Sequence, residues 1–207
     1  TSDTAANIDA PIHVAHSFTV HEEETESDYF TAVDDLKRDD DDSGADTIQE
    51  TELMSGLFYG YVVIDIPGLV SNLTGQDQNK WLSPDTDRTM AAEVVHNLIY
   101  LIAEISPGAK LGSTAPYSRA EMVLVEAGDR QPRSLSAAFR DPVDPNLHAA
   151  LSATANHLAS MDKLYETGEA RRSLHTLSDE LPAAPRGSLR EIAEWAKAAV
   201  LAGKAAP

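Results

Sequence analysis

The chain has 207 residues, 42% of them hydrophobic, and a formal net charge of −18. These values fit one ordinary domain with a real core and argue against a globally disordered chain. The absence of cysteine excludes a disulfide framework and thiolate metal sites and fits a reducing cytosol, so we expect a cytoplasmic location. Because no apolar run approaches the roughly 18 residues that a transmembrane helix needs, no membrane partner is expected.

The acidity is concentrated in one segment. Residues 21–52 hold 14 acidic residues against Lys37 and Arg38, a net charge of −12, which leaves −6 for the rest of the chain. Taken alone, this excess of acid argues against nucleic acid as a partner, because phosphate binding needs a basic surface. The charge is therefore a property of this segment and not of the whole surface.

One strand is predicted before this segment and one after it. Residues 11–20 (PIHVAHSFTV) place apolar residues on one face, with His16 among them, which is typical of a half-buried strand. Residues 56–66 (GLFYGYVVIDI) are rich in aromatic and β-branched residues and predict a second strand, ended by a Pro-Gly pair. Between them lies a polar insertion, 21–55, whose charge density predicts disorder over residues 22–52.

The second half of the chain predicts helices around one further strand. Residues 88–105 have helical periodicity. Their expected core-facing residues are Met90, Val94, Leu98, Leu101, Ile102 and Ile105. A third strand follows at 121–126. Further helices are expected at 134–140, at 146–168 and at 188–202, and the last of these opens on a capping box.

This order is β, insertion, β, α, β and then helices. It matches the last four elements, ββαβ, of a βαββαβ ferredoxin-like unit, so the predicted class is α+β. The first strand of that unit lies in the middle of the sheet. A remnant without it would have an open slot in the sheet, and we therefore expect the residues before Thr1 to belong to the same domain.

A small apolar island, Tyr29 to Val33, lies inside the acidic insertion. Two adjacent aromatic residues in a solvated loop reduce solubility unless another surface covers them. Two readings remain open from composition alone: the island anchors the insertion to the core of this chain, or a partner covers it.

The insertion also contains the spacing of a calcium-binding loop. Asp39, Asp41 and Glu50 take the first, third and twelfth positions of an EF-hand loop, with Gly44 at the sixth. Against this, Asp46 stands where a β-branched residue is usual, and a strand follows the loop instead of a helix. The alternative function is thus an acidic calcium-binding or protein-interaction module that uses the loop from Asp39 to Glu50.

No catalytic or cofactor site is predicted. The histidines form no pair with the spacing of a metal or hydrolytic site, and no nucleophile motif such as G-x-S-x-G occurs. We expect a non-enzymatic protein with no catalytic residue, no metal and no cofactor. His16 and His96 are expected in or near the core. The remaining expectation concerns surface or inter-subunit charges: Arg133, Arg171 and Arg172.

Several strings resemble one family. DAPIHVAHSFTVH, SDYFTAVDDL, SGLFYGYVVIDI, ISPGAKLGSTAPY and MVLVEAGDRQPRSLSAAF are similar to the C-terminal half of the backbone subunit of type I-E CRISPR Cascade, the CasC family. FTAVDDL and PGAK-x-x-S/T-A-P/A-Y/F are the most specific. The similarity runs from about residue 7 to residue 140, and the helical tail matches more loosely.

The resemblance implies a non-catalytic RNA-binding spine subunit of an antiviral surveillance complex. Family members carry a modified RNA-recognition-motif palm, a helical finger domain and a thumb-like β-hairpin. Copies stack head to tail along CRISPR RNA, and each thumb kinks the guide. In this chain, residues 1–140 would be a partial palm with 21–55 as the thumb, and 141–207 a helical segment of the same domain.

The implied RNA-binding residues are Tyr29, Phe30 and Thr31 at the thumb tip and Lys110 in the PGAK loop. The implied partners are CRISPR RNA, the target DNA strand, copies of the same subunit and other Cascade subunits. The chain departs from the family in lacking its N-terminal half, with the first strand, the finger domain and most basic guide-binding side chains. That missing half is a further expected partner.

Overall fold

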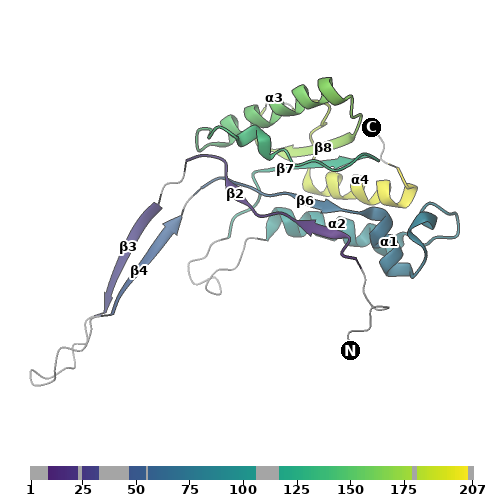
Figure 1. Ribbon diagram of the computed structural model, residues 1–207, viewed down its shortest axis with the longest axis horizontal. Coiled ribbons are helices and arrows are strands. Elements are labelled where there is room, and N and C mark those ends of the chain that lie inside the picture. The colour runs from purple at the N-terminus through teal and green to yellow at the C-terminus, as the bar shows by residue number, and fades with distance from the viewer. Residues whose placement is uncertain are drawn as a thin grey trace, which may run out of the picture.

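The structure is a computed structural model that describes residues 9–22, 25–32, 47–54, 56–105, 117–178 and 181–204, with backbone alone for 25–32 and 47–54. Its strands are β1 (Ile12–Val14), β2 (Phe18–Thr19), β3 (Thr25–Ala32), β4 (Thr47–Met54), β5 (Phe58–Tyr59), β6 (Val62–Ile64), β7 (Met122–Ala127) and β8 (Ala170–His175). Its α-helices are α1 (Ile66–Thr74), α2 (Thr89–Glu104), α3 (Leu147–Tyr165) and α4 (Leu189–Ala202), and short 3₁₀ turns are η2 (Gln78–Lys80) and η4 (Ser136–Phe139). The body is a layered α+β structure from which β3 and β4 project (Figure 1).

The main core lies between α2 and α4. Small residues bring the two helices together: Ala92 and Ala193 are completely buried, and Ala196 is nearly so. Leu69 and Val70 of α1 extend this core. The two closely packed helices form the apolar surface against which the strands pack.

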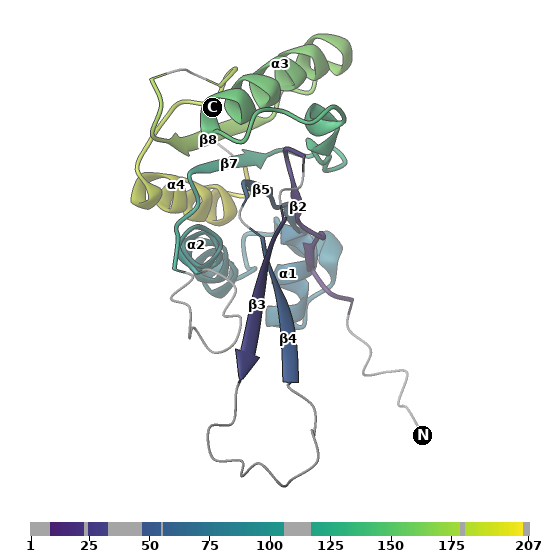
Figure 2. The same cartoon turned by 90° about the vertical axis from the view of Figure 1, so that its left-hand side faces the viewer.

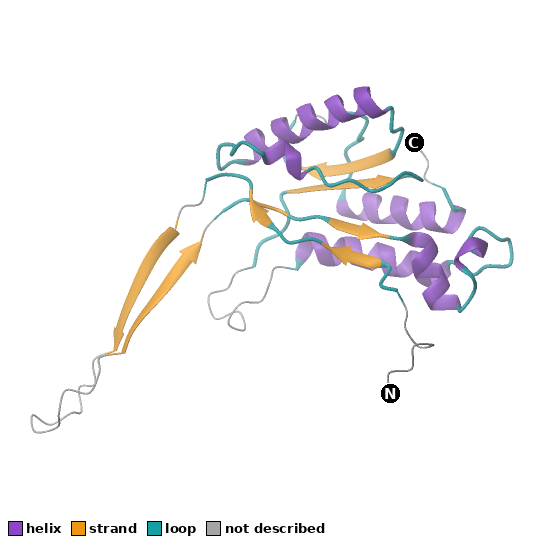
Figure 3. Cartoon of the chain, viewed as in Figure 1, coloured by secondary structure: helices purple, strands orange, loops and turns teal. Residues whose placement is uncertain are grey.

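Two of the ladders in the described residues lie on this core. β1 pairs antiparallel with β6, and β7 pairs antiparallel with β8. Ile64 of β6, Val125 of β7 and Leu174 of β8 all pack on the α2–α4 core. On the other face of β7, Leu124 packs with Leu151 of α3. The β7–β8 ladder is therefore covered by helices on both faces, as Figure 3 shows.

The first and last parts of the insertion pair with each other as the two strands of a β-hairpin. β3 and β4 pair antiparallel from Thr25 opposite Met54 to Ala32 opposite Thr47. For the paired residues this differs from the disorder predicted over 22–52, and residues 33–46 of that range lie outside the described residues. The paired segments are rich in threonine and apolar residues, which favour strands, whereas the run of four aspartates (39–42) lies outside them. The hairpin leaves the body as a narrow arm (Figure 2).

The predicted helix at 88–105 is confirmed as α2, but its predicted buried face is wrong for four of six residues, whereas Val94 packs on the core and Leu98 is half-buried. The buried residues are Ala91, Ala92, Val95, Ile99 and Ala103. Met90, Leu101, Ile102 and Ile105 of the predicted stripe are 44–66% exposed. Periodicity cannot choose between two apolar faces, and the alanine face wins because it permits the close contact with α4.

Other differences come from segments that looked too polar or too short. The predicted strand at 11–20 is split into β1 and β2, and His16 between them is exposed, whereas His96 is half-buried as predicted. The helix α1 was missed, although a proline lies in its first turn, where it is tolerated, and Gly75 ends it with a φ of 70°. The strand β8 was missed inside a segment predicted to be helical.

Buried charges join α3 to the β7–β8 ladder. Arg171 of β8 has only 2% of its side chain exposed. Its Nε donates to Glu126 of β7 at 2.7 Å, and its Nη atoms donate to Asp162 of α3 at 2.5 and 2.7 Å. Arg133 adds a contact to Glu169 at 3.1 Å. The prediction of Arg133 and Arg171 as surface or inter-subunit charges is wrong, because these acids form an internal site for them.

The hydrogen bond from Arg171 lowers the pKa of Asp162, with only partial opposition from burial. A carboxylate whose pKa is lowered by folding stabilises the fold fully above its unfolded pKa of about 3.9 and loses that contribution as the pH falls further.

None of the helices within the described ranges is long and apolar enough to cross a membrane.

Replacing Arg171 by Met should lower the free energy of unfolding by about 3–5 kcal/mol, because Asp162 and Glu126 would be left without their buried partner. Denaturant unfolding at pH 7 measures this loss, and the variant should also lose much of the decrease in stability below about pH 4. Arg119→Met is the matched control: Arg119 is 80% exposed and its pair with Glu104 spans 3.4 Å, so the change should stay under about 0.5 kcal/mol. Equal stability of the two variants would contradict the assignment.

Candidate nucleic-acid interface

The residues predicted for the thumb lie on the far part of the hairpin. Tyr29, Phe30 and Thr31 are in β3, opposite Glu50, Gln49 and Ile48 of β4. β3 ends at Ala32 and β4 begins at Thr47. The three predicted residues are therefore close together near the outer end of the described ladder, away from the body (Figures 1 and 2).

The hairpin joins the body through the short β2–β5 ladder. Phe18 pairs with Tyr59, and Thr19 pairs with Phe58. The ring centroids of Phe18 and Tyr59 are 5.3 Å apart, and the ring centroid of Phe139 in η4 lies 5.6 Å from that of Tyr59. The Tyr59 hydroxyl accepts a hydrogen bond of 2.9 Å from the Leu135 amide. The base of the hairpin is thus an aromatic joint held by three segments distant in sequence.

Beyond this ladder, the two chain segments are connected by a side chain. The Val20 amide donates to the Leu57 carbonyl at 3.0 Å, but the Val20 carbonyl accepts from the Val143 amide, also at 3.0 Å. The Leu57 amide donates instead to Nε2 of His21 at 3.0 Å. Nδ1 of His21 lies 2.6 Å from the carbonyl oxygen of Glu22. Sequence analysis did not single out His21, because its partner is 36 residues away.

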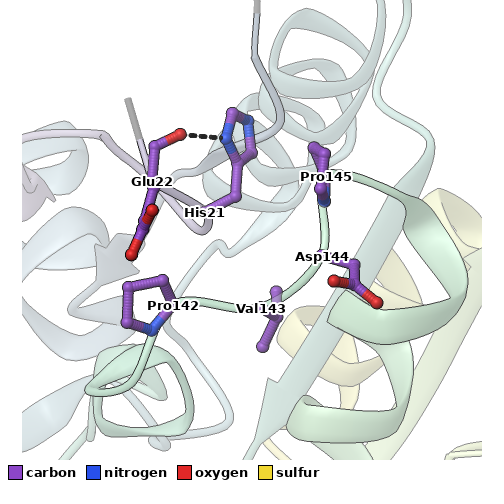
Figure 4. A pocket seen from close by; sticks show the side chains of 6 residues that line it. All are labelled: His21, Glu22, Pro142, Val143, Asp144 and Pro145. Carbon is purple, nitrogen blue, oxygen red and sulfur yellow. Dashed lines mark hydrogen bonds between the residues drawn. The ribbon is translucent and has the colours of Figure 1, made fainter. Parts of the chain in front are cut away.

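A hollow of about 280 Å³ lies beside this imidazole. Figure 4 shows it between the start of the hairpin, at His21 and Glu22, and the segment from Pro142 to Pro145. Glu22 and Asp144 both line it. The hollow therefore combines one buried imidazole with two carboxylates at the point where the hairpin leaves the body.

The sheet of the body is open in its middle. Among the described residues, no ladder joins β6 to β7, although both pack on the same helices. Their arrows point the same way with a space between them (Figures 1 and 3). Burial and nearby Tyr59 raise the pKa of Tyr61, just before β6, and Glu126 of β7 adds to this. The two inner strand edges therefore flank one shared region.

The remaining predicted sites are only partly covered. Lys110 and the rest of its loop, 106–116, lie outside the described residues. So does most of the proposed calcium loop; Glu50, its twelfth position, is in β4. Within the described ranges, no group of three or more histidines or acids is arranged to hold a metal ion. Tyr117, at the end of the predicted loop motif, is 77% exposed.

The fold is similar to that of two solved chains. One, titled "CRISPR RNA-guided surveillance complex", is 24% identical with a TM-score of 0.74, and the match covers 93% of this chain and 70% of the other. The second, "CRISPR RNA-guided surveillance complex, pre-nicking", is 24% identical with a TM-score of 0.77, and covers 93% and 55% respectively. At this level of sequence identity, the structural similarity shows a shared fold. No curated protein matches the chain in sequence.

The fold of this chain is an α+β palm with a projecting β-hairpin. Chains of the two complexes named above have a similar fold. The sequence places the chain within a family. Residues 1–198 match the CT1975-like proteins, and the chain belongs to that family.

Replacing Tyr59 by Phe tests the aromatic joint. The ring contacts should remain, but the Leu135 amide would lose its acceptor, so the free energy of unfolding should fall by about 1–2 kcal/mol. Amide exchange in residues 18–20 and 57–59 should also accelerate. Tyr117→Phe removes a hydroxyl from an exposed ring and should change neither quantity; a similar effect in both variants would refute the role of the Tyr59 hydroxyl.

Proposed function

We propose that this chain is part of a non-catalytic, RNA-binding spine subunit of a CRISPR RNA-guided antiviral surveillance complex, and that it corresponds to the backbone subunit of the type I-E Cascade, the CasC family. The observation that carries this proposal is the hairpin. It projects from the palm, has Tyr29, Phe30 and Thr31 in its outer part and is anchored at its base by several independent contacts.

Such a hairpin suits a subunit that must accept any guide sequence. A planar ring can fill the gap left by an unstacked base whatever that base is, and base–aromatic stacking contributes about 1–3 kcal/mol. We assign this role to Phe30, with Tyr29 and Thr31 beside it. Lys110 is proposed as a contact to a guide phosphate. No step of this function requires bond cleavage, so no catalytic group or cofactor is assigned.

The proposed partners follow from the same arrangement. An arm that extends beyond its own body is suited to reach a neighbouring copy, so copies would stack along CRISPR RNA. Each arm would act where the guide pairs with the target DNA strand, and other Cascade subunits would bind at the ends of the stack. The titles of the two structurally similar chains name surveillance complexes of this kind.

The negative charge of the insertion does not exclude this role. The four-aspartate run, residues 39–42, is not part of the paired strands β3 and β4. The positive charge that guide binding needs would come from the rest of the subunit. This chain spans 70% and 55% of the lengths of the two similar chains.

The open sheet supports a further proposed partner, an N-terminal half of the same subunit. β6 and β7 run in the same direction, and no described strand pairs with their facing edges, so a strand antiparallel to both could complete the sheet. Four large residues on the outer face of α2, Met90, Leu101, Ile102 and Ile105, are also exposed. An additional apolar element on that face would cover them.

Replacing Phe30 by Ala in the full-length subunit should weaken assembly on guide RNA by roughly 5- to 150-fold, because the loss of one stacked ring corresponds to about 1–3 kcal/mol. Binding measured on two guides of unrelated sequence should fall equally. Phe30→Tyr keeps the ring and should bind nearly as well as the original. If Phe30→Ala assembled normally, or if it failed on one guide only, Phe30 would not have the proposed role.

A second test addresses the open sheet. The amides of β6 and β7 that face the slot should exchange rapidly in residues 1–207 alone and slowly in the full-length protein, because a central strand would bind them there. The β1–β6 and β7–β8 ladders provide internal controls, since their amides should be protected in both samples. Equal exchange at the slot-facing amides in the two proteins would show that no strand enters.

A further inference from the structure

We propose that His21 is a positioning residue that locks the hairpin to the palm while its ring is neutral and releases it when the ring is protonated. The hydrogen-bond pattern is the first argument. A backbone amide can only donate, so Nε2 of His21, 3.0 Å from the Leu57 amide, must be the acceptor. The ring proton is therefore on Nδ1, which donates to the Glu22 carbonyl at 2.6 Å.

The imidazole replaces a missing rung of the ladder. In a regular antiparallel pair, Val20 and Leu57 would exchange both of their backbone hydrogen bonds. Only one is present, because the Val20 carbonyl accepts from Val143 instead. The ring supplies the acceptor that Leu57 would otherwise lack, and it does so from a site where only 7% of it is exposed.

Protonation abolishes this contact. An imidazolium ion has hydrogen on both ring nitrogens, so Nε2 can no longer accept from the Leu57 amide. Histidine is the side chain that ordinarily changes charge between pH 5 and 8. The lock is thus complete at neutral and higher pH and is lost as the pH falls.

The hollow beside the ring offers the charged form another position. The titratable residues that line it with His21 in the described structure are Glu22, next in the chain, and Asp144, from the segment after η4 (Figure 4). The neutral ring has its partner at Leu57, and a charged ring that leaves this partner has open space beside it, so the joint has two arrangements.

A small change at this joint is large at the outer end. β3 has eight residues, and at about 3.4 Å per residue a rotation of about 10° at its base moves its far end by roughly 5 Å. That movement would displace Phe30 from a base gap. This functional consequence rests on the proposed guide-binding role, whereas the lock itself does not.

Three variants separate the lock from general stability. His21→Gln places an amide oxygen at a similar reach and does not titrate, so it should keep the lock at every pH. His21→Ala removes it. Gly56→Ala provides an independent route, because a Cβ at Gly56 would lie 2.9 Å from Nε2 of His21 and displace the ring. His16→Gln, at an exposed histidine of the same segment, is the matched control.

The experiment uses the full-length protein without RNA. Amide exchange at Leu57 is one readout. Because the chain contains no cysteine, spin labels on Thr51→Cys in β4 and Asn97→Cys in α2 give the distance between hairpin and palm as a second. Lowering the pH from 7.5 to 5.5 should accelerate Leu57 exchange by at least about tenfold, after correction for its intrinsic rate, and broaden the label distances.

His21→Gln should abolish this response to pH, His16→Gln should preserve it, and His21→Ala and Gly56→Ala should be loose already at pH 7.5. A pH response that persists in His21→Gln, or a hairpin equally fixed in Gly56→Ala, would overturn the proposal. If His21→Ala does not fold, Gly56→Ala and His21→Gln decide the matter. If the lock is observed but Phe30→Ala still assembles on guide RNA, the guide-binding function fails and the lock stands.

Discussion

The contact between α2 and α4 holds the body together, because no backbone ladder joins its two halves of sheet in the described residues. Ala92 and Ala193 allow the helices to approach closely, and Ile64 of β6 and Val125 of β7 pack on the surface that results. Each ladder is thus fixed to the helices instead of to the other ladder. The open middle of the sheet exists only because the helices maintain it.

The hairpin depends on that body through a joint with separate parts. The aromatic rings of Phe18, Tyr59 and Phe139 resist bending, the Val20–Leu57 hydrogen bond fixes the distance between the two segments, and His21 completes the pairing. An arm that must act at a distance needs such a base more than it needs a core of its own. The acidic composition of the insertion is compatible with this, since the joint is made of uncharged contacts.

Local patterns predicted the elements that are stabilised locally. The capping box of Ser188 and Glu191 is present at the start of α4, and the ends of α2 lie where periodicity placed them. The buried face of α2 was not predictable, because its two apolar faces differ only in which one meets α4. The strand β8 was missed because Arg171 reads as a surface charge until Asp162 and Glu126 are known to meet it. For the site, the sequence placed Phe30 in the insertion but gave no sign of the contact between His21 and Leu57.

One further consequence concerns how such an arm can change. The insertion leaves the palm and returns to it at neighbouring positions, Val20 and Leu57, which are hydrogen-bonded to each other. Lengthening a loop with fixed ends costs only about 0.6 kcal/mol for each doubling of its length. Residues between Glu22 and Gly56 can therefore be added, lost or replaced with little effect on the palm, whereas His21 belongs to the joint itself. The arm is therefore a modular unit, and a change in its length leaves the packing of the domain that carries it intact.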